Sequence, residues 1–426
     1  MWLHFTTFDI TRGLILSVCS AMFIYLNYWH FSLPLIDTIF AILTLYFLLL
    51  SNQRVWFFFG VFMAILWFYW IGLSLEHYGY SWGLPVGIFL VSLGYGILFY
   101  IFAYISNFLS DKTSLPSLLF KALFLLGFSY IHPFGFDWFK PELMFVESYI
   151  GIQKWQFAIV LFALILSIWK KNLLFISLIL FAYQPTASST IPSNTSHANH
   201  IQIVTTHTTV EDKWNKTLHA KQFKKLFSII DQAIDANKTL IILPESVFPV
   251  FINRSQTLVD TLQEKAKHIN IVTGGLYLDG EIPRNSTYIF TSNKITVANK
   301  VVLVPFGESN PLPDFLSDWV NRVFYDNAVD YKASSNVVDY QIEGITYRNA
   351  ICFEATSEKL YTKDKKGHYP KNMIVLSNNG WFTPSIEPTL QKLLLQYYSK
   401  KYGTTIYHSV NMSQSYKIQN GNVLTY

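Results

Sequence analysis

The chain has 426 residues, of which 51% are hydrophobic, 17% aromatic and only 14% charged. This length allows at least two domains, and the formal net charge of +5 is too small to indicate nucleic acid as a partner. The apolar residues are concentrated before Tyr183, so the two halves of the chain differ in hydrophobicity and are unlike a single uniform domain. The pattern predicts a membrane domain over residues 1–184 and a more polar second half.

The membrane domain is expected to contain seven helical spans. A helix needs about 20 residues to cross a hydrocarbon core of about 30 Å, and several apolar runs reach that length. The last run is the shortest, and its loss would reverse the side on which the second half lies. The predicted spans cover residues 13–29, 33–50, 55–75, 82–109, 115–131, 150–169 and 172–184.

Basic residues in the loops define the predicted orientation. If all seven spans are real, one side of the membrane receives Arg12, Arg54, Lys112, Lys170 and Lys171. Because positive charge favours the cytoplasmic side, the N-terminus is expected in the cytoplasm and the second half outside it. A cleaved signal around Cys19 is a weaker interpretation, since the apolar run continues well past that residue.

A segment at 185–200, rich in Ser, Thr and Pro, is predicted to be a linker. Beyond it, short β-rich runs alternate with polar helical runs, which indicates an α/β domain over residues 201–426. Strands are expected at 201–205, 239–243, 270–277, 287–292, 345–352, 372–377, 405–411 and 414–418. Helices are expected at 212–237, 254–268 and 386–402.

Neither a cofactor nor a metal ion is expected in this second half. It contains no G-x-G-x-x-G or Walker sequence, so nucleotide binding has no support. Its first histidines are scattered through the linker, a strand end and a helix, which makes a shared metal site improbable. They stand at His197, His200, His207 and His219.

Cys352 is the one cysteine after residue 184 and follows the apolar run 349–351. It has no disulfide partner within its own half, and cysteines outside the cytoplasm are usually paired. Most unpaired cysteines are small buried hydrophobes, but this setting favours a nucleophile. Glu354 stands two residues further on, so in an extended strand both side chains would share one face.

Two other apolar runs carry a reactive group at an end. Pro244 stops a buried run and presents Glu245 at the carboxyl end, where α/β sheets bind ligands. Lys300 opens the run 301–304, and a Pro-Phe-Gly turn then leads to Glu308. Taken singly, Glu245 is equally well a cap of the next turn, and Lys300 is better explained as a surface residue beside a strand.

Taken together, these groups have complementary chemistry. A thiol with an ordinary pKa of about 8.5 is mostly protonated at neutral pH, and Glu245 could accept its proton as the sulfur attacks. Lys300 could stabilise both the thiolate and the oxyanion. No histidine stands in a comparable place, so a papain-like arrangement is disfavoured.

The order and context of these residues resemble the nitrilase superfamily. With the preceding spans, nearly the whole chain resembles the apolipoprotein N-acyltransferase family. The ordered set of motifs together with a membrane domain is far more specific than any single motif. The matching segments are 243–246, 300–308, 351–354 and Ser-Asn-Asn-Gly-Trp-Phe at 377–382.

The resemblance implies an αββα sandwich from about residue 200, with Glu245 as general base, Lys300 as oxyanion stabiliser and Cys352 as nucleophile. It implies supporting places in the active site for Glu308, Glu354, Trp214, Phe353, Asn378 and Trp381. The chain departs from the family pattern at Phe353, where the family commonly has tyrosine, and at Asn379, which replaces an aspartate. It also ends at Tyr426 without a final apolar span, so the domain is expected to be tethered from its N-terminal side only.

By the same resemblance, Cys352 takes an acyl chain from a phospholipid as a thioester and passes it to the α-amine of a lipoprotein's diacylglyceryl cysteine. The implied partners are the phospholipid donor, the diacylglyceryl-apolipoprotein acceptor and membrane lipids. The enzyme is expected to be a monomer in the bacterial inner membrane, with its catalytic domain in the periplasm.

Residues 315–325 place apolar side chains on one helical face, close after Glu308. Two interpretations are equally supported. The segment is either an amphipathic arm or lid at the membrane interface, or an ordinary helix packed on its own domain.

Two other classes of protein stay open. A membrane-anchored amidase would resolve the thioester with water, although a soluble substrate needs only one anchor. The second class is a lipid-binding or transport protein. The set of Glu245, Lys300 and Cys352 argues against it, because such a protein does not need these reactive groups. The shortage of ionisable residues within the spans also argues against it, since transporters often place some there. Asp37 and Lys121 are the few candidates for such residues, and both lie near predicted span ends.

Overall fold

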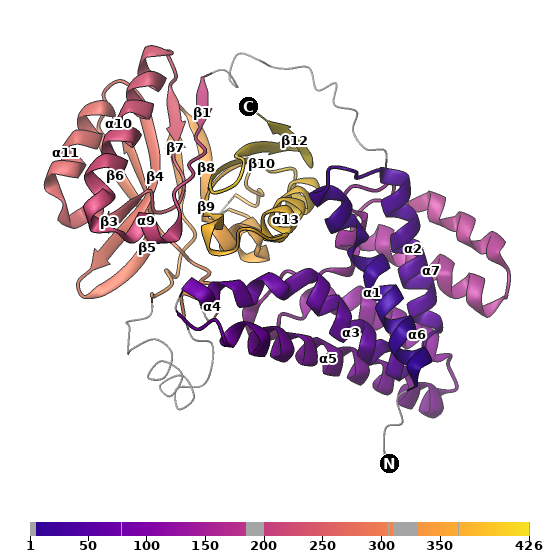
Figure 1. Ribbon diagram of the computed structural model, residues 1–426. Coiled ribbons are helices and arrows are strands. Elements are labelled where there is room, and N and C mark those ends of the chain that lie inside the picture. The colour runs from indigo at the N-terminus through magenta and orange to yellow at the C-terminus, as the bar shows by residue number, and fades with distance from the viewer. Residues whose placement is uncertain are drawn as a thin grey trace. The chain divides into compact units, whose positions relative to one another are not determined.

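The computed structural model describes residues 6–77, 79–184, 200–305, 307–309, 331–364 and 366–425 (Figure 1). The described residues fall into two compact units. The helical unit takes those within Met1–His132, Asp137–Ser188 and Pro384–Tyr397, and the α/β unit takes those within Pro133–Phe136, Ser189–Thr383 and Tyr398–Tyr426. The predicted fold class, an apolar helical region followed by an α/β domain, is confirmed.

Every predicted span corresponds to a helical segment, although the sixth begins at Lys154 rather than residue 150, and the seventh is a 3-10 helix. The segments of the helical unit are α1 (Thr7–Tyr28), α2 (Pro34–Leu50), α3 (Gln53–Phe68), η1 (Tyr69–Leu73), α4 (Ser74–His77), α5 (Gly83–Thr113), α6 (Ser117–Gly127), η2 (Phe128–Tyr130), η4 (Pro141–Phe145), α7 (Lys154–Trp169) and η5 (Leu173–Ala182).

Within the described part of the chain, three segments are long and apolar enough to cross a membrane: Thr7–Tyr28, Gln53–His77 and Gly83–Thr113. The segments Pro34–Leu50, Ser117–Tyr130, Lys154–Trp169 and Leu173–Ala182 are apolar but shorter. The count of seven spans therefore stays a prediction.

Close backbone approach holds α3 against its neighbours. A Cβ atom on Gly60 of α3 would lie 2.6 Å from the main-chain oxygen of Tyr95 on α5, so only glycine fits there. Ser17 of α1 donates a hydrogen bond of 2.9 Å to the Phe59 carbonyl of α3. Small residues at such crossings are typical of helices packed within a membrane, where close van der Waals contact replaces the hydrophobic effect.

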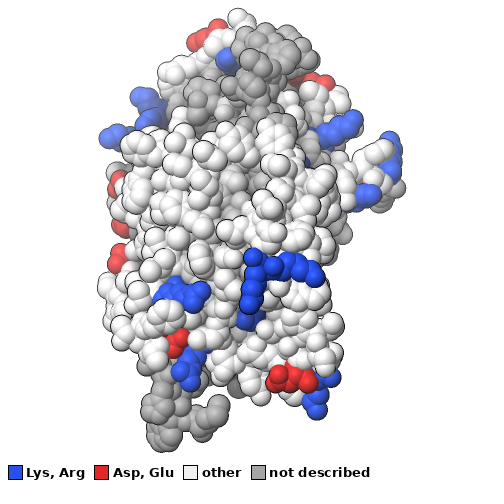
Figure 2. Space-filling model, turned by 90° about the vertical axis from the view of Figure 1, so that its right-hand side faces the viewer, with Lys and Arg blue, Asp and Glu red and all other residues white. Residues whose placement is uncertain are grey.

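The surface of the helical region is apolar over a broad area. Figure 2 shows a wide expanse without charged side chains, with Lys and Arg below it and at its upper edges. Large apolar side chains there are well exposed, which a water-soluble surface of this extent would not tolerate. The most exposed in the helical unit include Leu174, Leu180, Phe181 and Phe31, at 77%, 72%, 72% and 71%.

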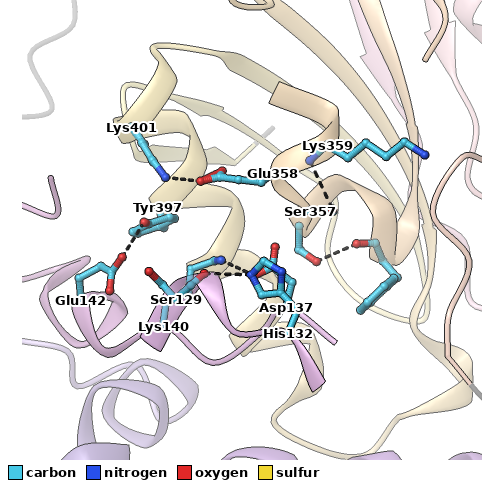
Figure 3. Close-up of polar contacts among 12 residues, drawn as sticks. Ser129, His132, Asp137, Lys140, Glu142, Ser357, Glu358, Lys359, Tyr397 and Lys401 are labelled. Atoms are coloured by element: carbon cyan, nitrogen blue, oxygen red, sulfur yellow. Dashed lines mark hydrogen bonds and ion pairs between the residues drawn. The ribbon is translucent and has the colours of Figure 1, made fainter. Parts of the chain in front are cut away.

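Buried ion pairs lie in the connection between α6 and α7 of the helical unit (Figure 3). Asp137 pairs with both Lys140 and His132, the latter at 2.9 Å. Glu142, fully buried, pairs with Lys154 at 2.7 Å and accepts a hydrogen bond of 3.0 Å from Tyr397. Buried charges are tolerated only when paired, so these contacts hold the connection in one conformation.

The α/β unit contains two six-stranded sheets. The first has the order β1-β2-β4-β5-β6, with β3 also paired to β4; the second has the order β12-β11-β10-β9-β8-β7. The strands of the first are β1 (Ile201–Ile203), β2 (Leu240–Ile242), β3 (Phe248–Phe251), β4 (Asn270–Asp279), β5 (Ile282–Thr291) and β6 (Lys294–Asn299). Those of the second are β7 (Asp339–Ile342), β8 (Ile345–Ile351), β9 (Asn372–Asn378), β10 (Thr405–Asn411), β11 (Tyr416–Gln419) and β12 (Asn422–Thr425).

The first sheet is buried on both faces. Leu240 and Ile242 of β2 pack toward the second sheet, in a core with Ile374 and Leu376 of β9. Ile241 points the opposite way, into a core formed with the helices α10 (His219–Asp235) and α11 (Gln256–Lys265). Alternate side chains of one strand thus serve two cores, which explains why β2 is a continuous apolar run.

Several predicted elements differ from the observed ones. The helix expected at 212–237 is broken into α9 (Val210–Trp214), η6 (Lys216–Leu218) and α10, because the Asn215 side chain caps η6 by accepting from the Thr217 amide at 3.1 Å. Strands β3, β6, β7 and β12 were not predicted. The remaining segments are η3 (Pro133–Gly135), η7 (Ile252–Arg254), η8 (Cys352–Thr356), η9 (Glu358–Tyr361), η10 (Asn379–Trp381) and α13 (Glu387–Tyr402).

Candidate active site

Cys352 stands directly after β8, at the first position of η8. Its φ angle is +52°, in the left-handed region that a residue with a Cβ atom seldom adopts. Such strain persists only where the surroundings enforce it, and it is common at functional sites. The turn ends the parallel pairing of β8 with β9 at Ile351 and presents the thiol at the carboxyl end of the sheet.

Glu245 occupies the equivalent place after β2 in the first sheet. Pro244 ends the strand, and Ser246 then adopts a φ of +49°. The neighbouring β4 strand passes so close that a Cβ atom on Gly274 would lie 2.7 Å from the Glu245 Cα atom. Glycine at position 274 is therefore needed for this turn to form.

A polar network joins Glu245 to Lys300. Asn285 of β5 donates from its Nδ2 atom to Oε1 of Glu245 at 2.8 Å and to Oε1 of Glu308 at 2.9 Å. The other oxygen of Glu308 pairs with Nζ of Lys300 at 2.7 Å. It also accepts from the Val304 amide at 2.9 Å, which fixes the turn that carries Glu308.

Burial makes the electrostatics of this network strong. Only 1% of the Lys300 side chain is exposed. Burial alone would lower the pKa of Lys300, but the charges of Glu308, Glu245 and Cys352 outweigh it and raise the pKa well above its usual value. Burial raises the pKa of Glu245, while the Lys300 charge opposes that rise and the Glu308 charge adds to it. Lys300 therefore stays charged, and Glu245 binds a proton more readily than an exposed glutamate.

Glu354 lies in η8, so the expectation that it shares a strand face with Cys352 is wrong. The chain turns at Cys352, and i,i+2 spacing no longer aligns the two side chains. The carboxylate instead accepts from the amides of Val301, Val302 and Ile351, at 2.7, 3.1 and 2.8 Å. It thereby ties the segment after Lys300 to the residue before Cys352. Burial raises the pKa of Glu354 to about 7, although the Lys300 charge and these amides oppose the shift.

Replacing Glu354 by glutamine should destabilise the α/β unit. The new amide group turns a donor toward amides that need an acceptor, and an unsatisfied buried donor costs about 1–3 kcal/mol. We expect a lower thermal midpoint in a melting experiment on the purified chain. Glu264→Gln is the matched control, since that side chain is exposed and forms an ion pair with Lys267 on the same surface. Equal midpoints for the two variants would contradict this role.

The other predicted residues occupy varied places. Trp214 ends α9 and is 41% exposed. Phe353 is buried, and its ring stacks on that of Phe136 with centroids 6.1 Å apart. Asn378 accepts from the Gly380 amide at 3.3 Å and from Asn411 at 2.7 Å, so it shapes the turn after β9. Trp381 ends the η10 turn that follows.

The amphipathic segment 315–325 lies outside the described residues. The described residues hold no group of three or more His, Cys, Asp or Glu side chains placed to bind a metal ion.

Two residues at this site were not anticipated from the sequence. Asn285 bridges the two glutamates, but a single asparagine in a strand carries no motif that would reveal it. Lys213 is only 2% exposed, and its Nζ donates to the main-chain oxygen of Glu245 at 3.2 Å. Its neighbour Trp214 was singled out instead, through the family resemblance, which gave no place to the lysine before it.

Two six-stranded sheets packed face to face, with a cysteine and a glutamate at their carboxyl ends, define an α/β sandwich domain that follows an apolar helical region. Residues 7–186 match the apolipoprotein N-acyltransferase integral membrane domain. The chain is 39% identical to an apolipoprotein N-acyltransferase of Wolinella succinogenes, over 94% of this chain and 93% of that protein. It is 34% identical to one of Helicobacter pylori, over 84% and 81%. The chain belongs to the apolipoprotein N-acyltransferase family.

Among solved structures, the chain is similar to a CN-hydrolase superfamily protein of Xanthomonas campestris. The identity is 14% and the TM-score 0.40, over 53% of this chain and 84% of that one. An amidase from Nesterenkonia sp. has 12% identity and a TM-score of 0.38, over 53% and 85%.

Proposed function

We propose that this protein transfers a fatty acyl chain from a phospholipid, through a thioester on Cys352, to the α-amine of a lipoprotein's diacylglyceryl cysteine. The family to which the chain belongs supports the overall reaction. The observation that carries the assignment of residues is the network of Glu245, Asn285, Glu308 and Lys300. The Lys300 charge also interacts with Cys352.

In the first step, the Cys352 sulfur attacks the carbonyl carbon of the phospholipid ester, and its proton passes to Glu245. Lys300 stabilises the negative charge that develops on the carbonyl oxygen. The ester C–O bond then breaks, and Glu245 returns the proton to the departing lysophospholipid. The raised pKa of Glu245 suits a group that must both accept and return a proton near neutral pH.

In the second step, the acceptor amine attacks the thioester carbon. A C–N bond forms, the C–S bond breaks, and Glu245 accepts the proton released by the amine. The sulfur leaves beside Lys300 and takes the proton from Glu245, which restores the Cys352 thiol and the Glu245 carboxylate. Glu308 holds Lys300 in place throughout, and Glu354 fixes the segment that follows it.

The membrane setting fits these substrates. Both reacting groups lie near the lipid headgroups, so a catalytic domain held at the membrane avoids much of the entropy of encounter. We place the protein in the bacterial inner membrane, with the N-terminus in the cytoplasm and the α/β domain in the periplasm. The loop lysines and arginines of the helical half support that orientation.

Mass spectrometry of the purified full chain tests the proposal. After incubation with phospholipid, we expect a fatty-acyl mass on the peptide that contains Cys352. Addition of a diacylglyceryl peptide with a free α-amine should discharge the adduct and yield an amide. The same peptide with an acetylated amine is the control and should leave the thioester in place.

Equal discharge with both peptides would mean that water resolves the thioester, and a membrane-anchored hydrolase would then be the better description. Absence of any acyl adduct on Cys352, with amide still formed, would remove the two-step mechanism altogether.

A further inference from the structure

Lys213 is a buried cation that the mechanism above does not use. It lies in α9, where the Thr209 side chain caps the helix by accepting from the Asp212 amide. The main-chain oxygen of Lys213 accepts a hydrogen bond of 3.1 Å from Nε2 of His219. The backbone at this position is therefore fixed from both sides, and the side chain points into the domain.

The Lys213 ammonium lies among catalytic groups. Its Nζ donates to the main-chain oxygen of Glu245 at 3.2 Å, and its charge interacts with the Glu245 carboxylate and the Cys352 thiol. Among the described residues, Lys213 forms no ion pair within 4.0 Å. Lys300, in contrast, is paired with Glu308 at 2.7 Å, so part of its charge is already neutralised.

Burying an ammonium without a paired carboxylate is unfavourable, and an apolar side chain of similar length would fill the same space at less cost. Burial lowers the pKa of Lys213 to about 8, although Glu245 and Cys352 oppose that shift. Lys213 thus remains mostly charged at neutral pH. Three carboxyl groups, those of Glu245, Glu308 and Glu354, are coupled to the single charge of Lys300, and Lys213 adds a second positive charge beside Glu245.

We propose that Lys213 is a second cation of the active site, which positions Glu245 through its main-chain oxygen and favours the ionised form of Cys352. The inference rests on the proposed role of Cys352 as nucleophile. Lys300 then serves mainly the oxyanion, together with its partner Glu308, while Lys213 serves the thiolate. The charged and titratable groups that act on Lys213 are Glu245 after β2, Cys352 after β8 and His219 on α10. Glu245 is in turn coupled to Lys300 and Glu308, which lie beyond β6.

The test is the pH dependence of alkylation of Cys352 by iodoacetamide, in the full chain with Cys19→Ser, followed on the Cys352 peptide by mass spectrometry. We expect Lys213→Met to slow alkylation at pH 7 about 10-fold and to move the midpoint of the profile up by about one pH unit. Lys213→Arg keeps the charge and should stay within about 3-fold of the parent. Lys213→Gln keeps a donor for Glu245 but no charge, so it should resemble Lys213→Met.

Lys359→Met is the matched control, because that Nζ also donates to a main-chain oxygen at 3.2 Å, that of Val301. A profile of Lys213→Met that coincides with the parent, or a shift equal to that of Lys359→Met, would overturn the inference. If Lys213→Met does not fold, an unshifted Lys213→Gln would do the same. Failure of the proposed function would be seen in a different experiment, in which Lys213 is unchanged. Amide formation would then persist in the Cys352→Ala variant.

Discussion

Replacement of Cys352 by alanine is expected to abolish acyl transfer. No acyl adduct should form with phospholipid, and amide formation should fall by about 10⁴-fold or more, because the substitution removes the attacking atom itself. Alanine keeps the Cβ atom, so it meets the same left-handed backbone at position 352 with the same strain. The loss should therefore appear in activity while the melting temperature stays close to that of the parent, measured with a diacylglyceryl peptide as acceptor.

Cys19→Ala is the matched control, since it removes the other cysteine of the chain from helix α1. It should retain full activity and full acylation. Residual amide formation by Cys352→Ala above the rate without enzyme would show that the acyl group can pass directly from phospholipid to amine, and the thioester would not be required.

Replacement of Glu245 by glutamine should reduce the rate of thioester formation by about 10²- to 10⁴-fold, as expected for loss of a general base. The amide cannot accept the thiol proton, although it can still receive the hydrogen bond from Asn285. The substitution also removes a negative charge beside the buried Lys213 and Lys300, so a lower melting temperature is expected in addition to the lower rate. Single-turnover acylation with phospholipid measures the step directly.

The pH dependence of that step gives a second readout. Glu245 must be ionised to act, and burial raises its pKa, with the Glu308 charge adding to the rise and the Lys300 charge opposing it. As pH falls, the wild-type rate should therefore decline at a pH above the usual range for glutamate. Glu245→Gln should lack this acid limb. Glu281→Gln, in the exposed turn between β4 and β5, is the control and should keep both rate and profile. If the rate of Glu245→Gln still declines as pH falls, that decline belongs to the titration of another group.

Much of the fold was predictable because it rests on local periodicity. The apolar runs of the helical half and the apolar stretches within strands β2, β4, β8 and β9 could be recognised without any tertiary information. The strands that were missed have a different character. β6 and β7 carry polar residues at alternate positions, such as Lys294 and Gln341, and they become strands by pairing with β5 and β8. Such pairing depends on residues distant in the chain.

The candidate site shows the same division. Glu245, Lys300 and Cys352 could be singled out because each stands at the end of an apolar run and has reactive chemistry. The place of Glu354 was misjudged, since the chain turns into a 3-10 helix at Cys352 instead of continuing as a strand. Asn285 and Lys213 could not be identified at all, because a strand asparagine and a helix lysine are ordinary until another segment is brought against them.

The sequence by itself determined the two-part architecture, the family resemblance and the three reactive residues, because these follow from hydropathy, residue chemistry and order along the chain. Only the tertiary structure decided how these residues are held. Lys300 pairs with Glu308, Glu354 ties the segment after Lys300 to the turn at Cys352, and Lys213 donates a hydrogen bond to the main-chain oxygen of Glu245. These contacts join residues from different strands and helices, and burial sets their strength. Neither the distances between these side chains nor their burial away from water can be obtained from the spacing of residues along the chain.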